Sequence, residues 1–394
     1  MKPPIDSASL SPLPRLQIRG RSLVPIVQGG MGVGVSAHRL AGAVAQTGAV
    51  GTLSAVDLRR HHSDLMEETG KSRDKALIDR ANLIALDREV KAALALADGR
   101  GLIAVNVMRA VSEYARYVTQ ACESGAQAIV VGAGLPLDLP DLCAAHPDVA
   151  LIPILSDARG IGIVLKKWMK KSRLPDAIVI EHPGWAGGHL GAARIEELND
   201  PRFEFARVLE DTFEVFRELG IERESVPLIP AGGISTPEQV RALFALGASA
   251  VQLGTAFAVT EECDAHPNFK RILAEAGAED IVTFTSVAGL PARAVKSPWL
   301  EKYLVKLEVL KGRAKPRSAC TLAFDCLQHC GLRDGIERFG QFCIDHHLAA
   351  AVAGDVERGL FFRGAGALPF GDRIRPVREL IAYLLSDPVP CAAG

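Results

Sequence analysis

Residues 226–255 read VPLIPAGGISTPEQVRALFALGASAVQLGT, which is two apolar strands separated by one helix. The first strand ends in Ala231-Gly232-Gly233, and the second ends in Gln252-Leu253-Gly254-Thr255. Glycine has no Cβ, so a backbone rich in glycine can approach a ligand closely. In a (β/α)₈ barrel, the loops after strands seven and eight form a common phosphate site. This stretch therefore predicts a barrel that binds phosphate through backbone amides at Gly232, Gly233, Gly254 and Thr255.

The same alternation of short apolar strands and helices runs through the first two thirds of the chain. The runs are apolar almost throughout, as expected of parallel strands that are buried on both faces. Helical segments are expected between them, for example at 36–47, 112–124, 161–170 and 236–246. We expect eight strands, at 24–28, 50–54, 102–107, 128–131, 150–155, 177–181, 227–230 and 250–253. The pattern predicts an α/β fold of the (β/α)₈ TIM-barrel type.

A doubly wound open sheet is the alternative, because it uses the same alternation. Glycine-rich ends follow the first, sixth, seventh and eighth strands, whereas an open sheet concentrates them at one switch point. The first strand leads into Gly30-Met31-Gly32-Val33-Gly34, whose glycine spacing resembles a dinucleotide fingerprint. That fingerprint requires an acidic residue at the end of the second strand, where this chain has Ser54. We therefore favour the closed barrel and exclude a Rossmann site.

The remaining sequence divides around this barrel. We expect an N-terminal arm at 1–22, the cofactor-binding barrel at 23–298, and a helical extension at 299–394 that packs on it. Helical insertions are expected at about 57–100, with a helix at 73–97, and at 198–219. Helical stretches in the extension are expected at 299–311, 332–342 and 377–385.

The composition excludes several classes of function. The 394 residues include 45 Lys and Arg against 46 Asp and Glu, a net charge of −1, so nothing points to nucleic acid or an anionic membrane as a partner. No apolar run approaches the ~18 residues of a membrane span, and no signal peptide is expected. Eight cysteines in a large chain without such a signal suggest reduced thiols in the cytoplasm. We expect a small-molecule substrate, and association into a homodimer is left open.

Two further side chains are candidates for chemistry. His189 lies in the glycine-rich loop Ala186-Gly187-Gly188-His189 after the sixth strand, where an imidazole would face the pocket and titrate near neutral pH. Asn106 ends the otherwise apolar third strand, and its amide suits the edge of a heterocycle. The alternatives are a loop histidine that bonds only to backbone and an asparagine that bonds only to the barrel.

The extension contains Cys320, Cys326, Cys330 and Cys343 within 24 residues, with three histidines nearby. This density raises the hypothesis of a zinc or iron–sulfur centre. The segment has no Cys-x₂-Cys pair, and Cys326 and Cys330 would share one face of a helix as small core residues. We therefore expect no metal.

Together these motifs resemble the nitronate monooxygenases, a family of FMN-dependent barrels related to flavin-dependent enoyl-reductases. The resemblance covers residues 23–299 and rests on Ala-Gly-Gly-His and Gln-Leu-Gly-Thr, with the glycine turn at Met31 and the Gly289–Arg293 stretch beside them. It implies FMN as cofactor and His189 as the residue that acts on the substrate. The residues implied or expected to bind the cofactor are Gly30, Met31, Asn106, His182, Gly187, Gly232, Gly233, Gln252, Leu253, Gly254 and Thr255.

The chain departs from the family's pattern at three places. Gly29-Gly30 replaces Ala-Pro before the methionine, His182 stands for a flavin-contacting glutamine, and Trp185 replaces an acidic residue before Ala-Gly-Gly-His. The resemblance therefore implies FMN more firmly than it implies a substrate. The expected activity is oxidation of nitronates or nitroalkanes by dioxygen. The alternatives are an NAD(P)H-dependent flavin reductase acting on a quinone or an enoyl thioester, and a phosphate-binding barrel without redox chemistry.

Overall fold

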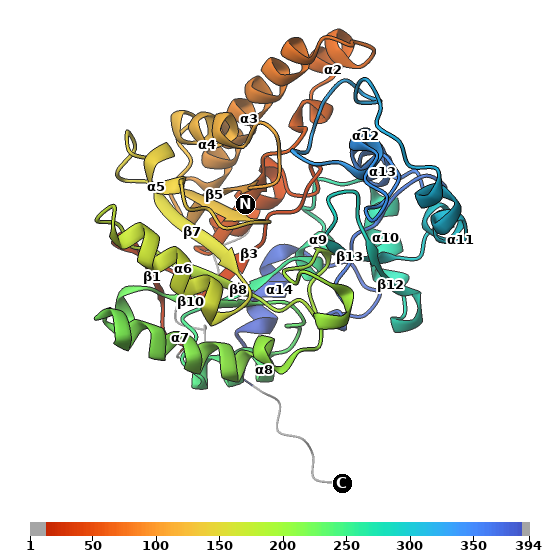
Figure 1. The fold of residues 1–394 in the computed structure, drawn as a ribbon. Helices are drawn as coiled ribbons and strands as arrows, with labels where there is room; N and C mark the ends of the chain where they lie inside the picture. Colours follow the sequence, from red (N-terminus) through yellow and green to blue (C-terminus); the bar gives the residue numbers. More distant parts are fainter. Residues whose placement is uncertain (1–12, 388–394) are drawn as a thin grey trace.

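The centre of the molecule is a closed barrel of eight parallel strands (Figure 1). The computed structural model describes residues 13–387. Around the barrel the strands follow the order β10-β11-β3-β4-β5-β6-β7-β8. Their bounds are β3 Ile26–Gln28, β4 Val50–Ser54, β5 Leu102–Met108, β6 Ala128–Gly132, β7 Ala150–Leu155, β8 Ile178–Glu181, β10 Leu228–Ala231 and β11 Val251–Leu253. The predicted barrel and all eight predicted strands are confirmed, with ends that differ by no more than two residues.

Apolar side chains fill the barrel and an N-terminal hairpin closes its floor. Strands β1 (Leu16–Ile18) and β2 (Arg21–Leu23) pair antiparallel. The buried side chains of Leu16, Ile18 and Leu23 pack in one cluster with interior residues of the barrel such as Val27 and Ile152. The described residues thus fill this end of the barrel, whereas the opposite end is where the strands reach their carboxyl termini.

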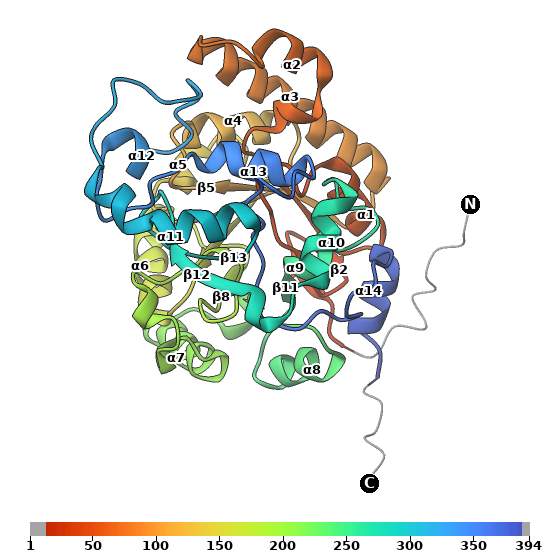
Figure 2. The same ribbon diagram turned by 90° about the vertical axis from the view of Figure 1, so that its right-hand side faces the viewer.

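Helices surround the barrel and connect its strands (Figure 2). The predicted insertion helix and the helix before β10 are confirmed as α3 and α7. The helices between β3 and β11 are α1 His38–Gln46, α2 Ser63–Thr69, α3 Lys75–Ala97, α4 Tyr114–Glu123, α5 Leu139–Leu142, α6 Ala158–Met169, α7 Phe205–Leu219 and α8 Pro237–Ala245. Short 3₁₀ turns lie at Leu58–His61, Ile195–Glu197, Pro201–Phe203, Arg223–Ser225 and, later in the chain, Ala278–Asp280.

The ends of these helices follow from local sequence. At the start of α8, the Thr236 side chain accepts from the backbone amide of Gln239, and Pro237 takes the first helical position. Gly48, Gly125 and Gly247 end α1, α4 and α8 with φ of +87°, +94° and +100°, a backbone conformation that glycine adopts without strain.

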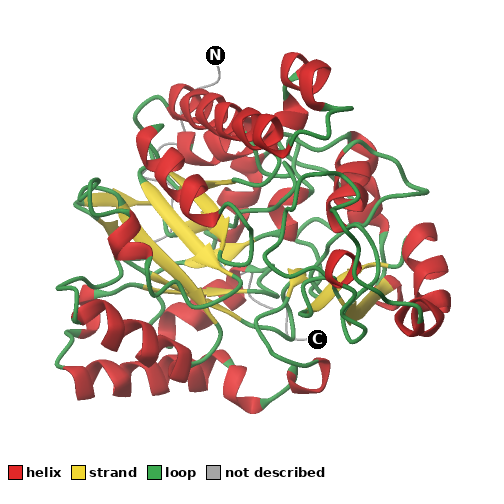
Figure 3. Cartoon of the chain, turned by 45° about the horizontal axis from the view of Figure 1, so that its top comes forward, coloured by secondary structure: helices red, strands yellow, loops and turns green. Residues whose placement is uncertain are grey.

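A second, small sheet lies beside the mouth of the barrel and was not predicted (Figure 3). It consists of β9 (Gly188–His189), β12 (Ile281–Thr285) and β13 (Pro291–Val295), in the order β12-β13-β9. Helices α9 (Thr255–Ala258) and α10 (Pro267–Glu275) separate the barrel from this sheet along the chain. The sheet matters because β9 contains the candidate histidine.

The C-terminal part contains α11 Pro298–Gly312, α12 Gly331–Asp334, α13 Ile344–Val352 and α14 Val377–Leu384. Helix α14 packs its buried Leu380 and Leu384 against Leu40 and Val44 of α1. The predictions for α11 and α14 are confirmed, but the prediction of a helix at 332–342 is wrong. That helix ends at Asp334 because Gly335 follows with a φ of +64°, which reverses the chain.

None of the helices between residues 13 and 387 combines the length and the apolar character needed to cross a bilayer.

Candidate functional site

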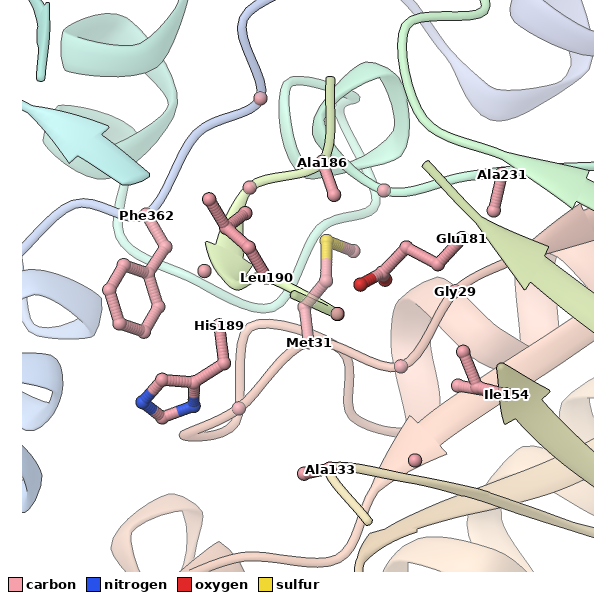
Figure 4. A pocket seen from close by; sticks show the side chains of 18 of the residues that line it. Gly29, Met31, Ala133, Ile154, Glu181, Ala186, His189, Leu190, Ala231 and Phe362 are labelled. Carbon is pink, nitrogen blue, oxygen red and sulfur yellow. The ribbon is translucent and has the colours of Figure 1, made fainter. Parts of the chain in front are cut away.

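A cavity of about 620 Å³ opens at the carboxyl ends of the barrel strands (Figure 4). Each barrel strand contributes residues at or just beyond its end, and residues 326–368 of the extension line the opposite side. Among the residues predicted for the site, the cavity is lined by Gly30, Met31, Asn106, Gly187, His189, Gly232, Gly233, Gln252, Leu253, Gly254 and Thr255. The barrel thus brings together residues that are up to 225 positions apart in sequence.

The ends of β10 and β11 present free backbone amides to this cavity. Gly232 and Gly233 have φ of +106° and +73°, so both positions need glycine. Within residues 13–387, the amides of Gly233, Gly254 and Thr255 donate to no protein acceptor, whereas the Gly232 amide follows the Ala231–Gln252 pair and belongs to the β10–β11 ladder. Backbone amides away from water rarely stay unpaired. Adjacent free amides at two strand ends fit a phosphate group, whose oxygens accept several hydrogen bonds.

Trp185 and the extension cover this glycine-rich corner. A Cβ placed on Gly233 would come within 2.9 Å of the Trp185 side chain. The backbone carbonyl of Trp185 accepts from the Ala365 amide at 3.1 Å, and the Gly364 amide donates to Thr255 Oγ1 at 3.0 Å. The corner is therefore enclosed by backbone on several sides, although the Trp185 side chain remains 47% exposed.

Asn106 explains why position 30, in the glycine-rich turn after β3, is occupied by glycine. A Cβ on Gly30 would lie 2.3 Å from the Cβ of Asn106, so only glycine fits there. The Asn106 amide donates to the Val130 carbonyl at a long 3.4 Å and also lines the cavity. It therefore retains hydrogen-bonding capacity for a ligand, which is compatible with the predicted contact to a heterocycle edge.

His189 is fixed by the small sheet rather than by a free loop. Its strand β9 pairs with β13, with Ala292 opposite His189. The imidazole meets the Phe362 ring edge-on at a centroid distance of 5.7 Å, and its buried Nε2 has no hydrogen-bond partner among the described residues. Burial lowers the pKa of His189 to about 4, so the ring is neutral at pH 7.

Arg293 holds the loop that leads to His189. Its buried guanidinium donates to the Ala186 carbonyl at 2.5 Å and to the Pro183 carbonyl at 3.2 Å. Such charge-assisted bonds are stronger than bonds between neutral groups. The position of His189 therefore depends on a residue that comes 104 positions later in the sequence.

Glu181 is a cavity residue that the sequence reasoning missed. It is the last residue of β8, and its carboxylate points into the cavity in Figure 4. No side chain of the described residues forms an ion pair or hydrogen bond with it, and burial raises the pKa of Glu181 to about 7. The signal was present, because an acidic residue follows the apolar run Ile178-Val179-Ile180 just as Asn106 follows an apolar strand.

His182 lies apart from the other predicted site residues. It is absent from the lining of the cavity, and its ring turns back so that Nδ1 accepts from the Gly184 amide at 3.0 Å. Its other ring nitrogen faces Glu204 at 3.7 Å, outside hydrogen-bond distance. The structure thus gives the predicted cofactor contact of His182 no support, whereas the preceding residue, Glu181, reaches the cavity.

The extension forms a wall that no sequence pattern indicated. Leu327, Ile344, Leu360 and Phe362 line the cavity across from the strand ends. Cys326 lines it as well, but it lies in a loop before α12, so the expectation that Cys326 and Cys330 share a helix face is wrong. In the described residues, no group of three or more metal-ligating side chains is placed to hold an ion.

Comparisons with known proteins agree on one family. The sequence pattern of the family described as nitronate monooxygenase matches residues 21–387. A probable nitronate monooxygenase of Bacillus subtilis is 40% identical over 78 residues, which are 20% of this chain and 22% of that protein. The nitronate monooxygenase of Pseudomonas aeruginosa is 37% identical over 73 residues, 18% of this chain and 21% of that protein. These alignments span only about a fifth of the curated relatives.

Solved structures match over nearly the whole chain. FabK from Thermotoga maritima superimposes with a TM-score of 0.61 and 22% identity, covering 92% of this chain and 91% of FabK. Nitroalkane oxidase from Streptomyces ansochromogenes gives a TM-score of 0.59 at 21% identity, covering 96% of both chains. At these identities the likeness concerns the fold.

Proposed function

The chain belongs to the nitronate monooxygenase family, and from this premise we propose that it is an FMN-dependent oxidoreductase that oxidises alkyl nitronates or nitroalkanes with dioxygen. The observation that carries the proposal is the grouping of free amides at Gly233 and Thr255, the carboxamide of Asn106 and the imidazole of His189 around one cavity. Such an enzyme requires a site for the phosphate, a polar group that binds the edge of the heterocycle, and a polar group that binds the substrate.

The amides at the ends of β10 and β11 would hold the phosphate of FMN. Three donors with no acceptor among the described residues, the amides of Gly233, Gly254 and Thr255, supply the hydrogen bonds that phosphate oxygens need, without a basic side chain. Met31 and Asn106 would lie along the isoalloxazine. When bound, FMN supplies the redox chemistry, because it takes electrons from the substrate and passes them to dioxygen.

His189 would bind the nitro group as a neutral imidazole. With its pKa lowered to about 4, the ring is a weak base at pH 7, so we assign it hydrogen bonding to a nitro oxygen rather than proton abstraction. Its unpaired, buried Nε2 is available for that bond. The edge of Phe362 packs against the ring and fixes its orientation.

Glu181 would exchange protons with the substrate. A carboxyl group whose pKa is about 7 is partly ionised at neutral pH, which suits a general base. In the ionised form, its oxygen can accept the proton from the carbon beside a nitro group and leave an anionic nitronate. Glu181 thus complements His189, because one side chain moves the proton and the other binds the charge.

The test begins with the colour of the purified protein. We expect flavin absorbance after FMN is added, and anaerobic bleaching by propyl nitronate followed by recovery in air. A colourless protein that takes up no FMN would refute the redox proposal and favour a phosphate-binding barrel without redox chemistry. Rapid bleaching by NADH or NADPH, with no response to the nitronate, would instead favour a pyridine-nucleotide-dependent reductase.

A further inference from the structure

The cavity extends beyond His189 into a compartment formed by the C-terminal extension. Leu327, Ile344, Leu348, Leu360 and Phe362 line this part, and we call it the tail chamber. The same five side chains belong to one packed apolar cluster that includes residues of α11 and α13. The packed cluster therefore supports the side chains that form the wall of the tail chamber.

The tail chamber offers almost no polar group to a ligand. Asp345 is its charged residue. Arg60 pairs with Oδ2 of Asp345 at 2.8 Å, and Oδ1 is buried without a hydrogen-bond partner among the described residues, so this carboxylate is the polar point of an otherwise apolar wall. Arg60 also pairs with the buried Asp57, so two carboxylates of the protein share the positive charge of its guanidinium group. The thiol of Cys326 is neutral, because burial raises its pKa well above the usual range. An apolar group would lose little by leaving water for this compartment.

His189 stands at the boundary between the tail chamber and the strand ends. Its ring contacts Phe362 of the chamber, while its backbone follows Gly187 and Gly188 of the cavity lining. A substrate whose polar head reaches Nε2 of His189 can therefore direct its carbon chain past Phe362. The chamber and the proposed reaction centre are parts of one continuous cavity.

We propose that the tail chamber binds the aliphatic chain of the substrate, so that the enzyme prefers long-chain alkyl nitronates to short ones. This inference rests on the proposed function and adds the substrate class. Burial of each methylene group improves binding by roughly fourfold in an apolar site. The gain should continue with chain length until the chamber is full.

The first experiment measures kcat/KM of the FMN-loaded enzyme for the nitronates of nitroethane, 1-nitrobutane, 1-nitrohexane and 1-nitrooctane. We expect an increase of roughly fourfold per methylene over the first part of the series. A series that is flat, or that falls with chain length, would overturn the inference.

Substitutions of Leu348 test whether the preference for long chains arises in the tail chamber. Leu348→Trp should fill the chamber and remove the increase of kcat/KM with chain length, so that the ratio of kcat/KM for the nitronate of 1-nitrooctane to that for the nitronate of nitroethane falls. Leu348→Ala enlarges the chamber and should move the optimum to longer chains, which keeps the inference testable if the tryptophan variant does not fold. Val305→Trp is the matched control, since Val305 is 81% exposed on α11 and faces away from the cavity. Equal behaviour of Leu348→Trp and Val305→Trp would contradict the assignment.

A binding experiment separates this inference from the proposed function. Butanoate, hexanoate and octanoate carry chains of the same length as the nitronates of 1-nitrobutane, 1-nitrohexane and 1-nitrooctane but no nitro group, and calorimetry measures their dissociation constants from the FMN-loaded protein. One outcome is that no nitronate is oxidised, that these ligands bind more tightly as their chains lengthen, and that Leu348→Trp removes this gain in affinity. That outcome would support the tail chamber and refute the proposed function. If nitronates are oxidised and neither series depends on length, the function stands and the chamber assignment falls.

Discussion

The two sides of the cavity hold a ligand by different means. At the ends of β10 and β11 the contacts are backbone amides exposed by Gly233 and Gly254, and side chains matter little. On the opposite side the surface consists of apolar side chains of the extension, such as Leu348 and Phe362. Backbone amides suit a constant group such as a phosphate, whereas a side-chain wall can change with single substitutions. Under the proposed function, the cofactor would bind on the first side and the variable part of the substrate on the second.

His189 lies between the two sides, and its loss should have the largest effect. We expect His189→Ala to lower kcat/KM for nitronates by ~10²–10³, because a hydrogen-bond donor to the developing charge is removed. Flavin absorbance should remain, since no phosphate contact changes. Steady-state kinetics and the visible spectrum check both parts. Unchanged turnover would show that the substrate does not reach Nε2.

The strand-end side can be tested at Gly254 more cleanly than at Gly233. A side chain at Gly233 would strain a φ of +73° and meet Trp185, so a defect there has two causes. A Cβ on Gly254 meets only Met31 Sδ, at 3.8 Å, an ordinary contact. Gly254→Ala should therefore fold normally. Its added methyl group would occupy space beside the amide, move the phosphate away from that donor, and weaken FMN binding by roughly 10–100-fold, the effect of losing a hydrogen bond to a charged group.

Fluorescence titration of the apoprotein with FMN measures this effect. Gly312→Ala is the control, because a Cβ at Gly312 meets no atom within 4 Å. Tight FMN binding by Gly254→Ala would place the phosphate elsewhere.

Glu181→Gln tests whether the cavity contains an unpaired carboxyl group. The pKa of Glu181 is raised from 4.5 to about 7 in the folded protein, so the native state is progressively destabilised as pH rises from about 4.5 to 7. The variant should unfold like the parent at pH 4 and be more stable by about 3 kcal/mol at pH 8. Urea unfolding of the apoproteins measures the difference.

The exposed Glu210→Gln on α7 is the control for this change of charge. His189 acts with the opposite sign, because its lowered pKa costs the native state stability as pH falls through 6.5 toward 4. An equal effect of Glu181→Gln at both pH values would show that Glu181 has a normal pKa.

The smallest expected effect concerns the hydrogen bond that joins the extension to the end of β11, from the Gly364 amide to the Thr255 hydroxyl. Thr255→Val removes the acceptor of the Gly364 amide and leaves that donor unpaired, at a cost of about 1 kcal/mol. Thermal unfolding should show a lower midpoint, with a small loss of FMN affinity because the extension no longer holds the corner closed. A change in chain-length preference without any change in stability would contradict this role.

The sequence was informative wherever a local pattern determined the structure. The eight barrel strands, the capped start of α8 and the glycine-rich ends of β10 and β11 all follow from neighbouring residues. The grouping of Asn106, His189 and Gly254 followed from the rule that carboxyl ends of barrel strands converge.

The sequence was uninformative where distant segments meet. Strand β9 has two residues and exists because β13 pairs with it, so its own sequence gives no period to detect. The wall at Phe362 and the guanidinium of Arg293 act on residues more than 100 positions away. His182 was named from the family's pattern, and its contact with the cofactor stays a prediction. Glu181, one residue earlier at the strand end, faces the cavity because successive side chains of a strand point to opposite sides.

The wall that residues 326–368 contribute contains none of the barrel strands. Its exchange between relatives would leave the eight parallel strands intact, as long as the contacts of Gly364 with Thr255 and of Ala365 with Trp185 are kept. Selection could therefore broaden or narrow the range of accepted compounds without rebuilding the redox centre. Because residues 326–368 lie outside the barrel strands, they are a suitable segment to vary in directed evolution.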